Sequence, residues 1–259
     1  MAQNLYSQRQ VALIREAGRV VAQCLQMIRE NIKVGATTRQ LDEMATAHIV
    51  KCGGRSPFKG YQFPGKVPFP ASLCASVNDV VVHGVPNDVP LKQGDLVSID
   101  IGCILNGYIG DAAWTFPVGE ADEAGKRLLK AGEEALYAGI AAMRPRGKLG
   151  ELSRAVQTLV ESRGYSVVRD YVGHGVGQQL HEEPQVPNYV TMKDRIPLLG
   201  KTLQPGMVLA VEPMVNERRH EVVSIEGQWP VRTKDGGRSV HFEHTVAILP
   251  DKIEILTKL

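Results

Sequence analysis

Two apolar, strand-like runs of this chain each carry a carboxylate. The run at 96–101 contains Asp100, and the run at 208–212 ends in Glu212. Burying an ionised carboxylate without a partner is strongly disfavoured, and neither run contains a lysine or arginine. A bound metal cation is the simplest group that holds several buried carboxylates together. The chain must therefore fold so that both carboxylates reach a source of positive charge.

The residues after Asp100 predict a hairpin that adds a third carboxylate. Asn106 and Gly107 lie between apolar flanks and are typical of a two-residue type I′ turn. A hairpin closed there pairs residues whose numbers sum to 213, so Asp100 is opposite Ala113. Asp111 then shares a face with Asp100 as its diagonal neighbour. Like charges this close destabilise the hairpin unless a cation lies between them.

The composition excludes several classes of protein. The chain has 259 residues, 43% of them hydrophobic, which is ample for a core, and its net charge of +2 creates no overall field for nucleic acid. Its cysteines form no CxxC pair, so neither a zinc ribbon nor a thioredoxin-type site is expected. Four cysteines in a chain of 259 residues do not make a disulfide scaffold, so the cysteine content fits a reducing compartment. The sequence shows no signal-peptide pattern and no run of about 18 apolar residues, so we expect a cytoplasmic protein that does not enter a membrane.

Apolar residues at helical spacing predict helices in both halves of the chain. A capping box at 7–10 starts the first helix, and Thr38 is expected to cap the second. A third helix covers roughly 122–143, and a fourth runs from Leu149 to Gly164. Strand-like stretches are expected at 73–83, 95–103, 108–118, 166–173, 207–215, 221–233 and 239–249.

An internal repeat relates the two carboxylate-bearing runs. At a spacing of about 112 residues, Gly94 maps onto Gly206 and Asp100 onto Glu212. Two similar halves that each direct a carboxylate inward predict a pseudo-twofold α+β domain with a shared central site. The predicted pseudo-repeats span roughly 8–119 and 122–250 of a single domain, 1–259.

Further candidate ligands lie in glycine-rich and apolar segments. The segment 173–184 carries His174 and His181 among glycines that suit a tight loop close to a ligand. Histidine is the commonest neutral metal ligand, although a lone histidine is more often structural. Glu243 lies in another apolar strand, and His83 ends a β-branched run.

The combined ligand set predicts metal-assisted hydrolysis. It comprises Asp100, Asp111, His174, Glu212 and Glu243. Such a hard, oxygen-rich set suits Mn²⁺, Fe²⁺, Co²⁺ or Zn²⁺. Its charge of about −4 at neutral pH roughly matches two divalent ions. Paired divalent ions activate a water molecule and stabilise a tetrahedral intermediate.

In these segments the chain resembles the type I methionine aminopeptidases. The resemblance is carried, in family order, by 76–86, 94–100, 110–111, 173–184, 211–214 and 242–245. It implies the pita-bread fold, an α+β architecture of two pseudo-symmetric halves with antiparallel sheet and outer helices. It also implies a metal-dependent aminopeptidase that removes the initiator methionine from nascent proteins with a small second residue.

The resemblance assigns a role to each residue of the site. The five candidate ligands would hold two divalent metal ions (Co²⁺, Mn²⁺, Fe²⁺ or Zn²⁺), with Asp111 and Glu243 bridging. Glu212 would also take a proton from the metal-activated water that attacks the methionine carbonyl. His181 would contact that carbonyl and its developing oxyanion, and His83 the scissile amide. The methionine pocket would be lined by Phe58, Tyr61, Phe69, Cys74, Leu180 and Trp229.

Some residues differ from the common pattern of these aminopeptidases. Leu180 stands where relatives often have an aromatic residue, and 62–68 resembles a short insertion at the pocket rim. Gly102 and His241 differ beside the metal ligands and could tune metal affinity. The departures at Leu180 and 62–68 concern the side-chain preference and not the metal chemistry.

Two other hypotheses remain open from the sequence. One is a related pita-bread peptidase, such as a prolidase or X-Pro aminopeptidase. The other is a non-catalytic pita-bread module that binds RNA or protein. The intact ligand set argues against the binding module, and prolidase-type relatives usually carry an extra N-terminal domain that we do not expect here. The expected partners of a methionine aminopeptidase are nascent polypeptide N-termini, with ribosome proximity left open. We expect no membrane or specific nucleic-acid partner, and a monomer.

Overall fold

The computed structural model describes residues 4–190 and 197–258 and has an α+β architecture. The first half contains α1 (Gln8–Asn31), α2 (Thr38–Lys51), β1 (Leu73–Val77), β2 (Val80–Val82), β3 (Leu96–Leu105) and β4 (Tyr108–Pro117). The second half begins with α3 (Glu123–Ala142), α4 (Leu149–Ser162), β5 (Ser166–Val167), β6 (Gly173–Gly175) and β7 (Glu182–Val186). It continues with the 3₁₀ helix η1 (Pro197–Gly200), β8 (Val208–Val211), β9 (Met214–Asn216), β10 (Val222–Ser224), β11 (Val231–Thr233), β12 (Ser239–His241), β13 (His244–Ile248) and β14 (Ile253–Ile255).

Both halves begin with two helices followed by strands, the order that the predicted repeat requires. The boundaries of the pseudo-repeats and the single domain stay predictions. None of the described helices is long and apolar enough to cross a membrane.

The helices form where the sequence predicts them, with one corrected cap. Ser7 caps α1 through the predicted capping box. For α2 the N-cap is Thr37 and not Thr38, because Thr37 is the residue three before Gln40, and the two side chains bond each other's backbone N–H groups. The Thr38 hydroxyl instead bonds the backbone of Asn87.

The hairpin of β3 and β4 has the predicted register. Asp100 is paired with Ala113 and Gly102 with Asp111, so the numbers of paired residues sum to 213. Asn106 and Gly107 both have positive φ, as a type I′ turn requires. The two aspartates therefore lie on one face of the hairpin as diagonal neighbours.

Several long strand-like stretches are broken into shorter strands. The stretch 73–83 divides at Asn78, whose φ is +54°, into β1 and β2. In the same way 207–215 divides into β8 and β9, and 239–249 into β12 and β13. The last two breaks fall at Glu212 and Glu243, so each of these carboxylates lies in the short gap between two strands.

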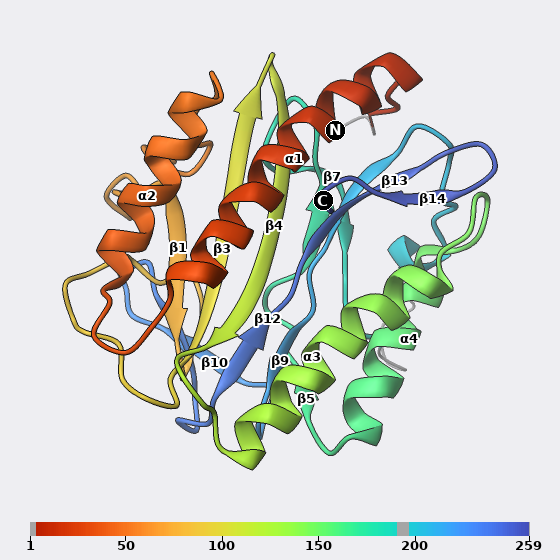
Figure 1. Cartoon of the computed structure of the whole chain (residues 1–259). Coiled ribbons are helices and arrows are strands. Elements are labelled where there is room, and N and C mark those ends of the chain that lie inside the picture. The colour runs from red at the N-terminus through yellow and green to blue at the C-terminus, as the bar shows by residue number, and fades with distance from the viewer. Residues whose placement is uncertain (1–3, 191–196, 259) are drawn as a thin grey trace.

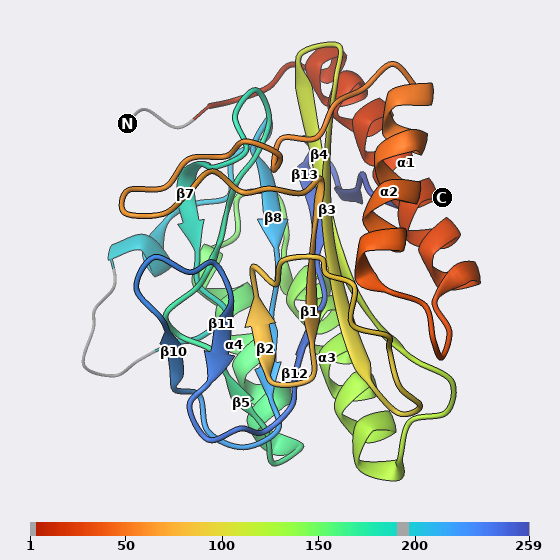
Figure 2. The ribbon, with the colours of Figure 1, turned by 90° about the vertical axis from the view of Figure 1, so that its left-hand side faces the viewer.

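The helices cover one side of the strands. Figure 1 shows α1 in front of β3 and β4, α2 in front of β1, and α3 and α4 in front of the strands of the second half. Figure 2 shows β10 and β11 on the opposite side of β3 and β4 from these first two helices. One hydrophobic core lies beneath each helix pair, and Trp114 packs against both cores.

Helix α1 packs closely against strand β4 at a pair of glycines. A Cβ atom at Gly110 of β4 would come within 2.4 Å of the backbone nitrogen of Gly18 in α1. A Cβ at Gly18 would come within 2.4 Å of the carbonyl oxygen of Leu256. Only glycine allows this contact, which holds α1 against β4 beside Asp111.

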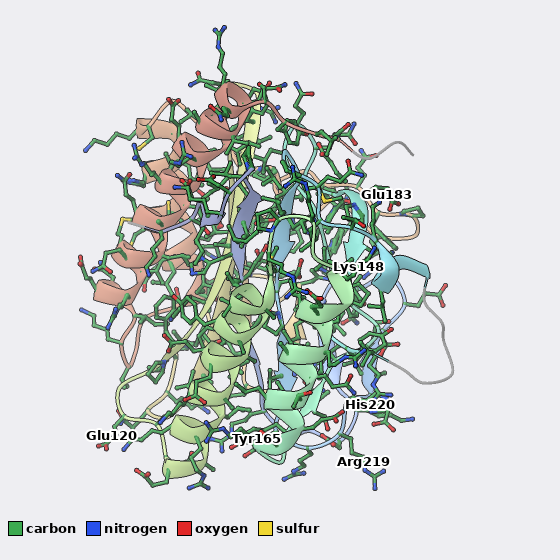
Figure 3. The ribbon with its side chains drawn as sticks, turned by 90° about the vertical axis from the view of Figure 1, so that its right-hand side faces the viewer. Glu120, Lys148, Tyr165, Glu183, Arg219 and His220 are labelled. Atoms are coloured by element: carbon green, nitrogen blue, oxygen red, sulfur yellow. The ribbon has the colours of Figure 1, made fainter. Side chains whose placement is uncertain are left out.

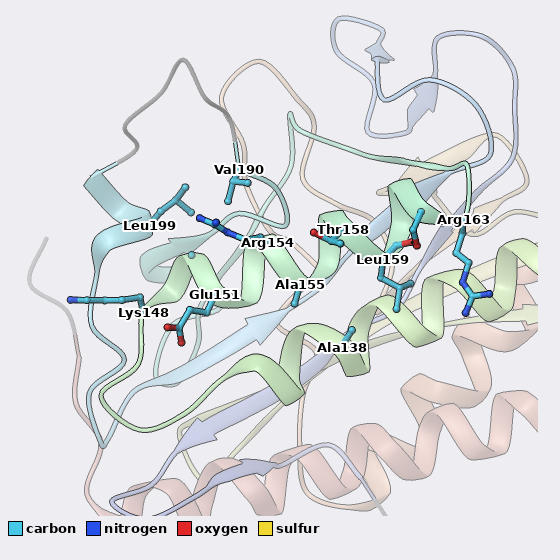
Figure 4. Close-up of a pocket in the computed structure, with 12 residues that line it drawn as sticks. Ala138, Lys148, Glu151, Arg154, Ala155, Thr158, Leu159, Arg163, Val190 and Leu199 are labelled. Atoms are coloured by element: carbon cyan, nitrogen blue, oxygen red, sulfur yellow. The ribbon is translucent and has the colours of Figure 1, made fainter.

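A groove of about 1070 Å³ lies along α4 and contains none of the predicted site residues. Figure 3 shows α4 between Lys148, just before its first residue, and Tyr165, beyond its last. Figure 4 shows Arg154, Thr158 and Leu159 lining the groove from α4. The candidate site lies elsewhere, on the strands.

Candidate metal centre

Each predicted metal ligand is carried by a different element of the sheets. Asp100 is on β3, Asp111 on β4 and His174 on β6, whereas Glu212 follows β8 and Glu243 precedes β13. Strand β8 pairs with both β13 and β6. Figure 2 shows β3, β4, β13 and β8 close to one another.

Hydrogen bonds join β4 of the first half to β13 of the second. The Thr245 hydroxyl accepts from the Asp111 backbone N–H at 3.0 Å and donates to the Asp111 carbonyl oxygen at 2.7 Å. The Glu243 backbone N–H donates to the carbonyl oxygen of Ala113 at 2.8 Å. These bonds bring Asp111 and Glu243 together across the boundary between the halves.

The side chains converge on one small volume. Ligand atoms of Asp111, His174 and Glu243 all lie within 4.8 Å of one another. Nε2 of His174 is 3.3 Å from Oε1 of Glu212. Asp100 is linked to this group through the hairpin register and through the charge of Asp111, which raises its pKa.

Each carboxylate of the cluster has a buried oxygen without a hydrogen-bond partner among the described residues. The atoms are Asp100 Oδ1, Asp111 Oδ1, Glu212 Oε1 and Glu243 Oε1. Leaving one buried polar group unsatisfied costs about 1–3 kcal/mol. Four such atoms in one cluster require a compensating group, and bound divalent cations would supply it.

The pKa values of the carboxylates also show that burying them together is costly. Burial raises the pKa of Asp111 to about 7. It raises the pKa values of Asp100, Glu212 and Glu243 well above their usual range, and repulsion from neighbouring carboxylates adds to this effect. Without a bound cation, the protein therefore favours partial protonation of the cluster at neutral pH.

His174 is prepared to offer a lone pair. Burial lowers its pKa to about 3, so the imidazole is neutral. Nδ1 is 2.9 Å from the carbonyl oxygen of Gly175, which can only accept, so this nitrogen carries the proton. The unprotonated Nε2 then faces Glu212 Oε1, an arrangement of two acceptors that a cation between them resolves.

Three residues outside the predicted ligand set, Asn188, His241 and Thr245, contact residues of that set. The Asn188 side-chain amide donates to the Glu212 carbonyl oxygen at 3.1 Å. Buried His241 places Nε2 3.6 Å from Glu212 Oε2. Thr245 and Asn188 were not singled out from the sequence; Thr245 follows the Glu243 motif closely enough to have been found, whereas nothing around Asn188 marks it.

His181 lies beside His174 at the surface of the site. The two imidazole centroids are 4.4 Å apart, with the rings nearly perpendicular. Atoms packed around the ring lower the pKa of His181 although the residue reaches solvent. Its Nδ1 is 2.9 Å from the Tyr61 hydroxyl.

His83 is brought to the site through aromatic neighbours. Its ring packs edge-on against Trp229, at a centroid distance of 6.2 Å, and against Tyr171 at 5.5 Å. Its φ of +60° bends the chain directly after β2. Burial lowers the pKa of His83 to about 4, and the charge of Lys66 adds to this effect.

The six predicted pocket residues belong to one hydrophobic cluster. They are Phe58, Tyr61, Phe69, Cys74, Leu180 and Trp229. Cys74 pairs with Asp100 in the β1–β3 register, so the cluster adjoins the ligands. Trp229 lies 5.3 Å from Phe69 and 6.5 Å from Tyr61, measured between ring centroids.

The predicted insertion at 62–68 covers Trp229. The indole Nε1 donates to the carbonyl oxygen of Val67 at 2.8 Å. The ammonium of Lys66 lies 5.0 Å from the indole centroid, within the range of a cation–π contact. This segment therefore forms an outer wall of the cluster.

Comparison with known proteins identifies the family. The sequence model of metallopeptidase family M24 matches residues 12–250. The chain belongs to this family. It is 47% identical to methionine aminopeptidase 1 of Bacillus subtilis over 251 residues, which cover 97% of each chain. It is 38% identical to the Escherichia coli methionine aminopeptidase, with 99% of this chain and 94% of the relative covered.

Solved structures of the family have the same fold. A methionine aminopeptidase from Thermotoga maritima matches with a TM-score of 0.92 and 40% identity over the whole of both chains. One from Rickettsia prowazekii matches with a TM-score of 0.92 and 36% identity, over 99% of this chain and 100% of that chain. A prolidase from Pyrococcus furiosus, at 22% identity and a TM-score of 0.75, shares the fold alone.

These matches confirm the predicted resemblance to the methionine aminopeptidases and the predicted pita-bread fold. Membership of a metallopeptidase family agrees with the divalent metal use predicted from the carboxylate cluster. The roles of individual site residues stay predictions.

Proposed function

We propose that this protein removes the N-terminal initiator methionine from nascent polypeptides whose second residue is small. The proposal is supported by relatives that carry the name methionine aminopeptidase over nearly the whole chain. It is also supported by the convergence of four unpaired buried carboxylate oxygens and a neutral imidazole nitrogen. That convergence is the observation on which the proposal depends, because metal-assisted hydrolysis requires ligands that can hold divalent ions.

In the proposed site, Asp100, Asp111, His174, Glu212 and Glu243 would hold two divalent ions. Two ions are favoured because one leaves about two negative charges of the cluster uncompensated. Mn²⁺, Fe²⁺, Co²⁺ and Zn²⁺ all suit this mixture of carboxylate and imidazole ligands. When bound, the ions polarise a water molecule and offset the charge that develops on the substrate carbonyl.

The side chains around the metal centre divide the remaining tasks. Glu212 would accept a proton from the attacking water, since its buried carboxylate lies between His174 Nε2, at 3.3 Å, and His241 Nε2, at 3.6 Å. His181 donates a hydrogen bond to the oxygen of the methionine carbonyl. His83 contacts the scissile amide and assists proton movement to the leaving amine.

The methionine side chain enters the hydrophobic cluster beside the metal ligands. Its thioether packs well against aromatic edges such as those of Phe69 and Trp229. Cys74, opposite Asp100, and Leu180, next to His181, complete the wall nearest the reacting carbonyl. Tyr61 and Phe58 close the remaining sides.

The proposed partners are nascent polypeptide N-termini in the cytoplasm. Ribosome proximity and a monomeric state stay predictions. The intact ligand cluster argues against the hypothesis of a non-catalytic binding module, which has no use for unpaired buried carboxylates.

The proposed function is tested with protein purified without a chelator. Elemental analysis is expected to find a first-row divalent metal, and the protein should release methionine from Met-Ala-Ser but leave an Ala-Pro dipeptide intact. Glu243→Gln should lose metal and activity together, while Glu133→Gln on the exposed face of α3 keeps both. Equal cleavage of Ala-Pro, or activity that survives complete metal removal, would contradict the proposal.

A further inference from the structure

A hydrogen bond between distant segments reaches the back of the His181 imidazole. The Tyr61 hydroxyl lies 2.9 Å from Nδ1 of His181, and the two residues are 120 positions apart in the chain. Their rings meet edge-on at a centroid distance of 5.4 Å. The Gly60 N–H donates to the carbonyl oxygen of Phe69, and the Phe69 N–H donates to the carbonyl oxygen of Tyr61. These two backbone bonds hold the segment that carries Tyr61.

The Nδ1 partners of the two neighbouring histidines differ in kind. His174 Nδ1 faces the carbonyl oxygen of Gly175, which only accepts a hydrogen bond. His181 Nδ1 faces a phenol, which can donate one. A neutral imidazole carries a proton on one nitrogen only, so the partner of Nδ1 decides what Nε2 offers. The carbonyl leaves His174 Nε2 with a lone pair, and a donating phenol leaves His181 Nε2 with a proton.

We propose that Tyr61 is a positioning residue that sets His181 in the Nε2–H tautomer, opposite to that of His174. The inference rests on the proposed function, in which His181 donates to the substrate carbonyl and His174 bonds a metal ion. Burial raises the pKa of Tyr61, so the phenol keeps the proton that it donates to His181 Nδ1.

The opposed tautomers are needed because the two rings are close neighbours with different tasks. A lone pair on His181 Nε2 would repel the carbonyl oxygen that this residue has to stabilise. Tyr61 therefore serves the reaction through His181, in addition to lining the pocket with its ring.

The test combines ring-nitrogen NMR with kinetics, on protein that is ¹⁵N-labelled at histidine and loaded with Zn²⁺, a d¹⁰ ion without unpaired electrons. In the wild type, His181 Nδ1 should resonate as an unprotonated nitrogen and Nε2 as a protonated one. Tyr61→Phe keeps the ring and removes the hydroxyl. It should mix the two tautomers and lower kcat for Met-Ala-Ser about tenfold, with little change in KM because the pocket wall remains.

Tyr137→Phe is the matched control. Its hydroxyl lies 3.5 Å from Nε2 of a different histidine, His244, away from the pocket cluster. This variant should leave the His181 signals and kcat unchanged, and both variants should keep the wild-type melting temperature within a few degrees.

Three results would overturn the inference. They are a protonated Nδ1 on His181 in the wild type, ring signals that do not respond to Tyr61→Phe, and an unchanged kcat despite altered signals. The NMR measurement needs no substrate. A wild-type protein that fails to release methionine therefore counts against the proposed function, while the tautomer of His181 is still read directly.

Discussion

Asp111 is the residue on which the electrostatics of the site centre. Its side chain is only 3% exposed, and it raises the pKa values of Asp100, Glu212 and Glu243. Its own pKa is raised from 3.8 to about 7. A carboxyl group whose pKa is raised in the folded state stabilises the metal-free protein below pH 3.8 and loses that contribution as the pH rises towards 7.

Asp111→Asn should therefore stabilise the metal-free protein while abolishing its function. Relative to wild type, the free energy of unfolding should be nearly unchanged at pH 4 and higher by about 1–4 kcal/mol at pH 7.5. Metal affinity should fall more than roughly 100-fold, because Asp111 is a proposed ligand. Loss of a residue that only hydrogen-bonds a ligand usually costs less than this. Urea unfolding at several pH values and metal titration measure both changes.

Comparing the variant with wild type cancels the titration of the buried histidines, which acts in the opposite direction. Asp251→Asn, on an exposed residue, should change neither quantity. A variant that binds metal as wild type does, or that is less stable than wild type at pH 7.5, would refute the central position of Asp111.

At the scale of single residues, the sequence predicts the carboxylates better than their supports. Asp100 and Glu212 stand out because a charged group in an apolar run is costly wherever it is buried. Asn188 does not stand out in the sequence, because polar residues are common in loops. Its role becomes visible only in the fold, where its side chain donates to the Glu212 carbonyl oxygen.

The loop between β6 and β7 is held by the segment that precedes α1. The Tyr6 hydroxyl donates to the Glu182 carboxylate at 2.7 Å and accepts from the Gln178 backbone N–H at 3.0 Å. The Tyr6 ring also fills the space beside Gly177, where a Cβ would come within 2.2 Å of the phenol oxygen. His181 precedes Glu182, so Tyr6 fixes the loop that presents it.

Tyr6→Phe should loosen this loop without altering the metal ligands. We expect a loss of about 1–2 kcal/mol in the free energy of unfolding, faster hydrogen exchange at Gln178 and Gln179, and a KM raised several-fold at unchanged metal content. Tyr108→Phe removes the hydroxyl of the ring that packs edge-on against Tyr6 and should not affect exchange in the loop. Loop exchange equal to wild type in Tyr6→Phe would show that the hydroxyl does not hold the loop.

At the scale of elements, local patterns predict helices and the β3–β4 register, but not the breaks in strands. The helices follow from caps and apolar stripes, and the register follows from the turn at Asn106 and Gly107. The break at Glu243 coincides with a contact between the halves, the bond from Glu243 N–H to the carbonyl oxygen of Ala113. Such contacts leave no periodic signal in the sequence.

In the whole molecule, the proposed metal site and Trp114 join the two halves. Asp100 and Asp111 come from the first half, and the other three proposed ligands from the second. Trp114 packs on both hydrophobic cores and lies 4.9 Å from Phe242, measured between ring centroids. The pseudo-repeat predicted from the sequence accounts for two similar halves, but the packing between them was visible only in the structure.

The chain should therefore unfold as one cooperative domain. Trp229→Phe leaves Trp114 as the only fluorescent tryptophan, and its urea transition should coincide with that of the backbone circular dichroism. Added Mn²⁺ should move both transitions together to higher urea, because binding stabilises only the folded state. Two separate transitions, or a shift of one alone, would mean that the halves are independent domains.

The central claim is that carboxylates from separate strands and one imidazole enclose a pair of divalent ions. The most direct test is anomalous X-ray scattering from crystals grown with Mn²⁺, recorded at the manganese absorption edge. The claim predicts two peaks about 3.5–4 Å apart. Asp111 and Glu243 should bond the ions at both peaks. Asp100 should bond one of these ions, and His174 and Glu212 should be the remaining protein ligands. No peak among these residues at saturating Mn²⁺ would contradict it.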